Sequence, residues 1–273
     1  IRTVLVTCTD GRCGDAPGGL KPGEAGHDVP ALIALRRTEL EKSCSILNVS
    51  DLETLDYADS GMDGWPQNNE PGSFWSTPVA EAAERLADLM RKYRPDVVVT
   101  YDAFGFYGHP DHIQAHRITM AAVELTGIPA KVYWTTMPRS AMEKFGAMMQ
   151  ELGEGAPGEE AAANSDAGNS EAGAGPAKVG EVQPSDARPV DPEPDMSKIG
   201  LPDDEIHTWV DAREFGRQKY EALASHASQN DHAVVIGLGV ERFTELMGVE
   251  TFTRVHDSTN SPLEETDLFT GLR

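Results

Sequence analysis

The stretch VVVTYDAFGFYGHPDH (residues 97–112) decides the fold and the chemistry that we expect of this chain. Its first five residues are apolar and largely β-branched, which is typical of a buried strand. A glycine-containing loop then leads to a helix that opens near Pro110, because proline suits the first turn of a helix. Two histidines and Asp111 therefore lie at the carboxyl end of a strand, the edge where open α/β sheets bind ligands. The pattern predicts half of a metal site here.

Strand and helix patterns alternate through the first 150 residues. Apolar residues recur at helical spacing after Asp28, which suits an N-cap, and again over residues 77–93 and 110–125. Short apolar runs between them predict four strands, at residues 3–8, 52–57, 97–101 and 131–136. This alternation predicts an α/β fold with a Rossmann-like, mostly parallel sheet that has helices on both faces.

The second half of the chain divides into an insert and a C-terminal part. Residues 151–196 are rich in Ala, Gly, Glu and Pro and contain no aromatic residue, so we expect a disordered acidic insert. An acidic binding tail is the alternative. Residues 1–150 would form the catalytic core, and residues 197–273 would complete the same domain. In that last part the pattern predicts loosely ordered final residues and three elements: a helix over 212–228, a short strand over 233–236 and a short helix at 243–247.

Composition narrows the class of partner. The formal net charge of −22 argues against nucleic acid and anionic membrane surfaces, because both would repel the chain. Cys8, Cys13 and Cys44 are too few for a disulfide framework, and this favours a reducing, cytoplasmic setting. No apolar run approaches the roughly 20 residues that a membrane span needs. Nucleic acid and membranes are therefore disfavoured as partners, while the oligomeric state stays open.

The histidines near residue 110 are the candidate metal ligands. His112 is a candidate because neutral imidazole is the commonest metal donor in proteins. His112 and His116 are four residues apart on the predicted helix, a spacing that can place two ligands on one face. In the alternative interpretation these side chains only cap a helix or face the solvent.

The segment VVVTYDAFGFYGHPDHIQAHR (97–117) resembles the second signature of the PIG-L/LmbE-type zinc-dependent N-acetylglucosaminide deacetylases. Within that family it is most similar to the actinobacterial N-acetylglucosaminyl-inositol deacetylases of mycothiol biosynthesis. The resemblance implies hydrolysis of a sugar acetamide by metal-activated water. It covers most of the chain outside the insert, through VLVTCTDG (4–11), RRTELEKSCSILNV (36–49), DSGM (59–62), VYWTTMPRS (132–140), LPDDEIHTWVD (201–211) and KYEALASHASQ (219–229).

The resemblance also implies a cofactor and a set of roles. The cofactor would be one zinc ion per subunit, with iron(II) as the alternative. Such a metal ion lowers the pKa of its bound water and polarises the amide carbonyl. The implied roles fall on six residues: His112 as a zinc ligand, His109 as an oxyanion partner (imidazolium or hydrogen-bond donor), Asp111 as the group that orients an imidazole, Tyr107 beside the substrate carbonyl, and Arg36 and Asp59 on sugar or inositol hydroxyls.

Two features depart from the family pattern. The His-Pro-Asp-Asp run that follows the family's first strand, and that supplies two zinc ligands and the general base, is absent. Since the chain opens on what resembles the second strand, we expect the central first strand to be missing and zinc binding to be weak. A natural variant that has lost zinc catalysis is the alternative. Phe104 and Phe106 replace an Asn-Gly-Gly run, which leaves the identity of the substrate open.

Other functions compete with deacetylation. A mycothiol S-conjugate amidase is the nearest enzymatic alternative, and a non-catalytic sugar-binding member without a complete metal site is the alternative from another class. A nucleotide-binding Rossmann protein is disfavoured, because no Gly-x-Gly-x-x-Gly run follows the strand at residues 3–8.

Overall fold

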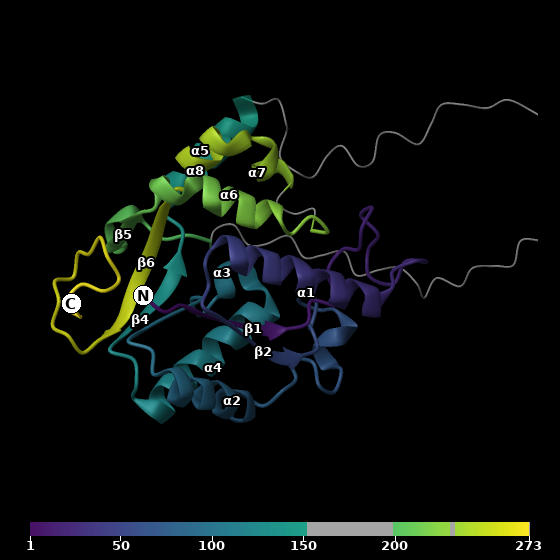
Figure 1. Ribbon diagram of the computed structural model, residues 1–273, viewed down its shortest axis with the longest axis horizontal. Coiled ribbons are helices and arrows are strands. Elements are labelled where there is room, and N and C mark those ends of the chain that lie inside the picture. The colour runs from purple at the N-terminus through teal and green to yellow at the C-terminus, as the bar shows by residue number, and fades with distance from the viewer. Residues whose placement is uncertain (152–198, 230–232, 273) are drawn as a thin grey trace, which may run out of the picture.

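The computed structural model describes residues 1–151, 199–229 and 233–272 (Figure 1). The predicted insert lies outside the described residues from position 152 on. The strands are β1 (Val4–Thr9), β2 (Asp51–Tyr57), β3 (Val97–Thr100), β4 (Lys131–Thr136), β5 (Thr208–Asp211) and β6 (Val249–Asp257). The longer helices are α1 (Val29–Ile46), α2 (Val79–Tyr93), α4 (Pro110–Thr126), α5 (Arg139–Glu151), α6 (Gly216–Ala224) and α8 (Gly239–Met247). Two short helices complete the set, α3 (Gly105–Gly108) and α7 (Ala233–Gly237).

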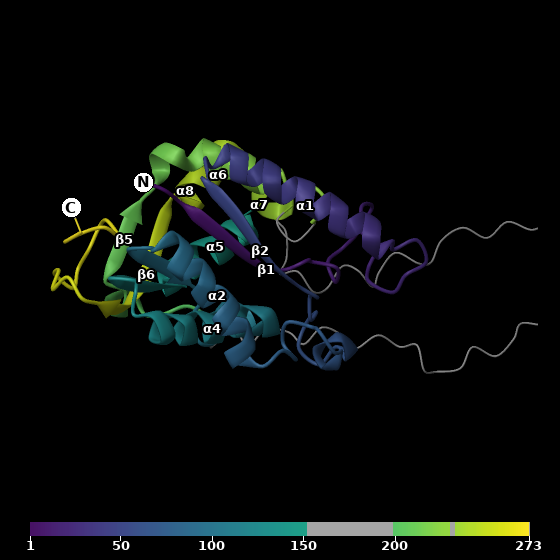
Figure 2. The ribbon, with the colours of Figure 1, turned by 60° about the horizontal axis from the view of Figure 1, so that its bottom comes forward.

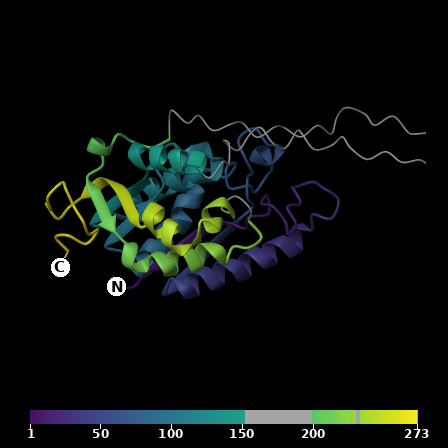
Figure 3. The same cartoon turned by 90° about the horizontal axis from the view of Figure 1, so that it is seen from above.

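The strands lie between two layers of helices. Figure 2 shows α2 and α4 on one face and α1, α6 and α8 on the other. Figure 3 shows α1 running alongside α6. Glu39 of α1 is buried and accepts hydrogen bonds from the backbone nitrogen and the hydroxyl of Ser228, at 2.8 and 2.7 Å. These bonds tie the C-terminal part to the first helix. The helix-covered α/β fold is therefore as predicted.

The strands form two separate sheets. β1 pairs with β2 in parallel, and the second sheet has the order β3-β4-β6-β5. β3 and β4 are parallel, as predicted, whereas β6 runs antiparallel to both β4 and β5. Among the described residues no strand pairs with the second edge of β1 or with that of β3. Leu5 and Val99, on these two strands, are 40% and 43% exposed. The gap between the two sheets, between β1 and β3, lies where the family's first strand was expected from the sequence.

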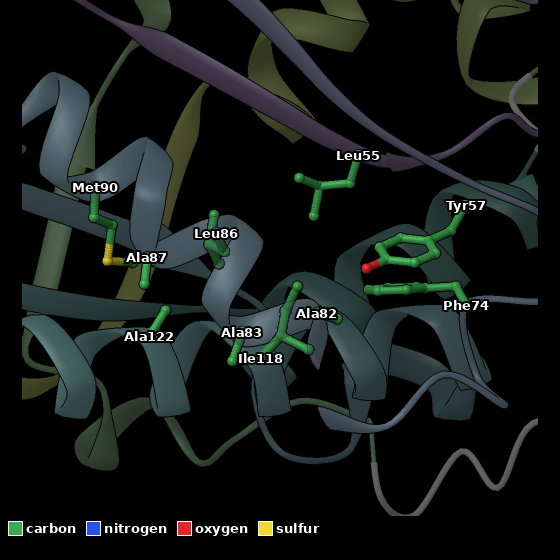
Figure 4. Packing of buried hydrophobic residues seen from close by; sticks show 10 residues of the cluster. All are labelled: Leu55, Tyr57, Phe74, Ala82, Ala83, Leu86, Ala87, Met90, Ile118 and Ala122. Atoms are coloured by element: carbon green, nitrogen blue, oxygen red, sulfur yellow. The ribbon is translucent and has the colours of Figure 1, made fainter. Parts of the chain in front are cut away.

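The main core fills the space between β2, α2 and α4 (Figure 4). Tyr57 and Phe74 stack with ring centroids 5.2 Å apart, and Leu55 lies beside them in the cluster. The small side chains of Ala83 and Ala122 are fully buried, so α2 and α4 approach closely. α2 ends at Arg94, which has a left-handed conformation directly before Pro95. This packing fixes the position of α4, and α4 carries the candidate histidines.

The C-terminal part differs from the prediction. The strand predicted at residues 233–236 is wrong, since this segment is helix α7, where Val234 is 42% exposed. A run of four apolar residues does not distinguish a strand from a helix. β6 occupies the free edge of β4, and neither it nor β5 and α5 was predicted. The helix predicted over 212–228 is shorter, spanning Gly216–Ala224, while α8 confirms the last predicted helix.

The final residues are anchored rather than loose, because Glu265 is fully buried. Its carboxylate pairs with Lys131 of β4, which is also fully buried, and lies 2.9 Å from the guanidinium of Arg254. The hydroxyl of Tyr133 donates to the same carboxylate at 2.7 Å. One buried acidic group thus fastens the tail to β4 and β6. No helix in the described part of the chain combines the length and the apolar character that crossing a membrane requires.

We expect Glu265→Ala to lower the free energy of unfolding by about 3–5 kcal/mol, because it leaves Lys131 as an unpaired charge in the interior. Urea unfolding followed by circular dichroism measures this loss. Glu41→Ala is the matched control, since it breaks the exposed pair with Arg37 and should cost about 0.5 kcal/mol. Equal losses in the two variants would contradict the anchoring role of Glu265.

Candidate active site

A tight loop between β3 and α4 builds the site. Gly105 has φ +67°, and a Cβ atom there would lie 2.7 Å from the backbone nitrogen of Ile113. Only glycine allows this approach, so the loop lies against the first turn of α4. Phe106 also has a positive φ of 68°, an uncommon conformation for a non-glycine residue. The side chain of Asp102 accepts from its backbone nitrogen at 3.0 Å and holds it there.

His109 caps α4 through its side chain. Its Nδ1 accepts the backbone N–H of Asp111 at 3.1 Å, so in the neutral ring the proton lies on Nε2. Burial of the ring lowers the pKa of His109, which keeps the ring neutral near pH 7. Of the two forms that the sequence left open, the structure favours the neutral hydrogen-bond donor over the imidazolium.

His112 has the opposite tautomer. Its Nδ1 lies 3.2 Å from the carbonyl oxygen of Gly105, and a carbonyl can only accept, so Nδ1 carries the proton. Nε2 then keeps its lone pair. Burial, followed by the neighbouring His109, lowers the pKa of His112 to about 4. The ring centroids of the two histidines are 4.8 Å apart. The site therefore places one N–H donor beside one nitrogen lone pair.

Asp111 links α4 to the loop that follows β2. It is 6% exposed, and its Oδ2 accepts the backbone N–H of Ser60 at 3.0 Å. Its Oδ1 is buried and has no hydrogen-bond partner among the described residues. Burial, and then the nearby Asp59 carboxylate, raise the pKa of Asp111 well above its usual range. The carboxylate makes no described bond to an imidazole, although the family role predicted one.

The other predicted residues lie on neighbouring loops. Asp59 accepts the backbone N–H of Gly61 at 2.8 Å. Arg36 donates to the carbonyl of Gly11 at 2.7 Å, and a Cβ at Gly11 would meet its guanidinium at 2.6 Å. The ring of Tyr107 stands edge-on to His112 with centroids 5.1 Å apart. The structure thus brings together His109, Asp111, His112 and Tyr107, with Asp59 beside Asp111. Arg36 instead contacts the loop that follows β1.

The sequence prediction missed Asp10 and Arg12. Both follow β1 at its carboxyl end, and the guanidinium of Arg12 donates to the Asp10 carboxylate at 2.9 Å. Asp10 also accepts the backbone N–H of Asp59 at 3.2 Å. Their position directly after a predicted strand could have identified them, because the carboxyl ends of strands are where such sheets bind ligands. His116, which was considered as a second ligand, uses its Nδ1 on the carbonyl of Tyr101 at 2.9 Å, and its ring lies edge-on to Trp134 with centroids 5.0 Å apart.

The described residues do not by themselves complete a metal site. No group of three or more His, Cys, Asp or Glu side chains within the described ranges is arranged to hold a metal ion. His112 offers one well-oriented nitrogen, which is one donor of the four ligands typical of zinc. Cys8, Cys13 and Cys44 are all free thiols.

Comparison with known proteins decides the family. Residues 1–123 match the PIG-L model, described as GlcNAc-PI de-N-acetylase. A 1D-myo-inositol 2-acetamido-2-deoxy-α-D-glucopyranoside deacetylase of Salinispora arenicola is 37% identical over 98% of this chain and 81% of its own length. The chain belongs to the PIG-L family. This confirms the resemblance inferred from residues 97–117.

Two further comparisons support that assignment of family and fold. The deacetylase of the same name from Thermobifida fusca is 36% identical, over 97% of this PIG-L chain and 87% of its own length. Among solved structures, the 4-carboxy-2-hydroxymuconate hydratase GalB of Pseudomonas putida superposes with a TM-score of 0.51 at 15% identity, covering 96% of this chain and 87% of its own. That likeness concerns the fold alone, since one fold supports several reactions.

Replacing the buried carboxylate should stabilise the metal-free protein at alkaline pH. Because the pKa of Asp111 is higher in the folded protein than in the unfolded chain, the free energy of unfolding of the wild type falls as the pH rises from about 4 through the folded-state pKa. Asp111→Asn has no carboxylate to ionise and should not show this fall. The asparagine oxygen keeps the bond from Ser60. We expect a gain on the order of 1–3 kcal/mol at pH 8 and little gain at pH 4.5. Urea unfolding with EDTA at both pH values measures it, and a pH-independent effect would contradict the assignment.

We expect zinc to bind the 273-residue chain weakly, because the described residues supply a single oriented nitrogen donor. Isothermal titration calorimetry of the chain after EDTA treatment measures the affinity, with His112→Ala as the comparison. Weak wild-type binding should become weaker still in His112→Ala. Tight, stoichiometric binding that survives His112→Ala would show that His112 is not a ligand.

Proposed function

We propose that this site hydrolyses the acetamide of an N-acetylglucosamine-type substrate such as N-acetylglucosaminyl-inositol. The observation that carries the proposal is the pair of partly buried, neutral imidazoles with opposite tautomers, His109 with a free N–H and His112 with a free lone pair. Amide hydrolysis needs a donor for the oxyanion of the tetrahedral intermediate and a nitrogen that can hold a metal. The two histidines meet those needs within 5 Å of each other.

Each side chain has a task in this reaction. His109 would donate its Nε2–H to the oxyanion, and its cap bond to Asp111 keeps the ring pointing in one direction. Tyr107 would lie beside the substrate carbonyl, since its ring already contacts both imidazoles edge-on. Zinc is the cofactor that we infer, with iron(II) as the alternative, and His112 would be one of its ligands. The described residues do not by themselves supply a complete set of ligands.

The carboxyl ends of β1 and β2 would bind the sugar. Asp59 presents a carboxylate beside Asp111, and Arg12 has a 40% exposed side chain in the next loop. Carboxylates and guanidinium groups are suited to sugar and inositol hydroxyls. Arg36 would act by holding the loop at Gly11 as well as by direct contact. Phe104 and Phe106, whose ring lies edge-on to Tyr107 with centroids 6.2 Å apart, make the loop between β3 and α4 more apolar than a glycine run would.

A parallel strand between β1 and β3 would complete this site. Within the described residues both strands have an unpaired edge, and burial, followed by the nearby Cys8 of β1, raises the pKa of Tyr101, which comes directly after β3. The carboxyl end of such a strand would lie beside His112. We infer that the missing ligands belong at that position, which agrees with the sequence-based expectation about the family's first signature.

An assay for acetate release from N-acetylglucosaminyl-inositol by the protein tests the function. His109→Asn keeps a good helix cap but removes the ring N–H, and we expect kcat to fall by about 10²–10³-fold. His256→Gln, on the exposed side of β6, is the control and should leave kcat unchanged. Release of an amine from a mycothiol S-conjugate without acetate release would favour the amidase. Sugar binding without turnover would favour the non-catalytic member.

A further inference from the structure

Tyr101 lies directly against the candidate metal-binding histidine. It follows the last residue of β3, and its ring stacks on the imidazole of His112 with centroids 4.1 Å apart and planes only 5° from parallel. Tyr101 does not belong to the buried cluster between β2, α2 and α4. Its ring is therefore placed on the site rather than in the main core.

His112 is held on both faces. The ring of His109 is also stacked on it, at 4.8 Å with an interplanar angle of 28°. Two rings at these distances cannot share one face of an imidazole, so Tyr101 and His109 lie on opposite faces. Tyr107 approaches edge-on at 5.1 Å. The imidazole of His112 therefore has little freedom to tilt out of its plane.

A ring flip about the Cβ–Cγ bond is opposed by a different contact. The Nδ1–H of His112 donates to the carbonyl of Gly105, and flipping the ring would place a carbon there instead. Tyr101 also acts through its backbone, because its carbonyl accepts from Nδ1 of His116 one turn further along α4. One residue at the end of β3 thus contacts two successive turns of α4.

We propose that Tyr101 is a positioning residue that keeps the His112 ring in one plane and one tautomer, with the Nε2 lone pair available to the site. The planar ring supplies this restraint, and the hydroxyl does not. Tyr101→Phe should therefore behave as wild type, whereas the non-aromatic Tyr101→Leu should let the imidazole tilt and lose its bond to Gly105. The consequence for turnover rests on the proposed deacetylase function, while the consequence for the ring does not.

Nitrogen-15 NMR of the imidazole groups at pH 7.5, in metal-free protein, reads the tautomer directly. His112→Asn identifies the signals of His112. We expect one dominant Nδ1–H tautomer in wild type and in Tyr101→Phe, and a mixture of tautomers in Tyr101→Leu. Tyr101→Ile, whose β-branched side chain suits a strand end, replaces the leucine variant if that variant does not fold.

Steady-state kinetics of acetate release supply the second measurement. In Tyr101→Leu we expect kcat to fall by about 10–100-fold, the range typical of residues that orient a metal ligand, with KM unchanged. Tyr93→Leu is the matched control, because it removes a tyrosine ring that stacks on Lys92 and Arg2 and hydrogen-bonds to Glu53. It should change neither the tautomer nor kcat.

The outcomes separate the two proposals. A wild-type tautomer and wild-type kcat in Tyr101→Leu would overturn the positioning role, and so would a loss in Tyr101→Phe as large as that in Tyr101→Leu. If the wild-type protein releases no acetate but Tyr101→Leu shows a mixture of His112 tautomers, the proposed function is overturned and the positioning role is supported.

Discussion

The close approach of Gly105 to the first turn of α4 is the constraint on which the site depends. A side chain at this position would lie within 3 Å of Ile113 and His112, so the loop can take this path only with glycine. The same approach brings the Gly105 carbonyl to Nδ1 of His112. A backbone contact therefore decides which nitrogen of the candidate ligand is free. The strained conformation of Phe106 is a further cost of this tight loop, which the packing of α2 against α4 can offset.

Burial sets the electrostatics around that contact. Without a cation, the interior favours neutral forms, which lowers the pKa of both imidazoles and raises the pKa of Asp111. A neutral histidine can bind a metal through its free nitrogen, and it still has one N–H to donate to an oxyanion. A nearby cation would reverse the effect on Asp111, because an opposite charge favours the carboxylate. Binding of a cation at the site is therefore expected to lower the pKa of Asp111 and to ionise its carboxyl group.

The sequence predicted the first half of the fold better than the second for a physical reason. Residues 1–150 alternate between periods of 2 and 3.6, and proline, glycine and Asp28 mark where the elements change. β6 gave no such signal, because it forms by pairing with β4, and that partner is more than a hundred residues away. The buried Glu265 was likewise invisible as an isolated acid near the chain end. The histidine cluster was local and was found, whereas Asp10 and Arg12 join it only through tertiary pairing with Asp59.

The break between the two sheets gives Asp111 a second significance. β1 and β2 deliver Asp10 and Asp59, whereas β3 and α4 deliver the histidines, and no strand pairing joins the two groups within the described residues. The bond from Ser60 to Asp111 is one direct link across this division, and it lies at the centre of the site. The carboxylate that would influence the chemistry therefore also sets the distance between the sugar-binding loops and the histidines.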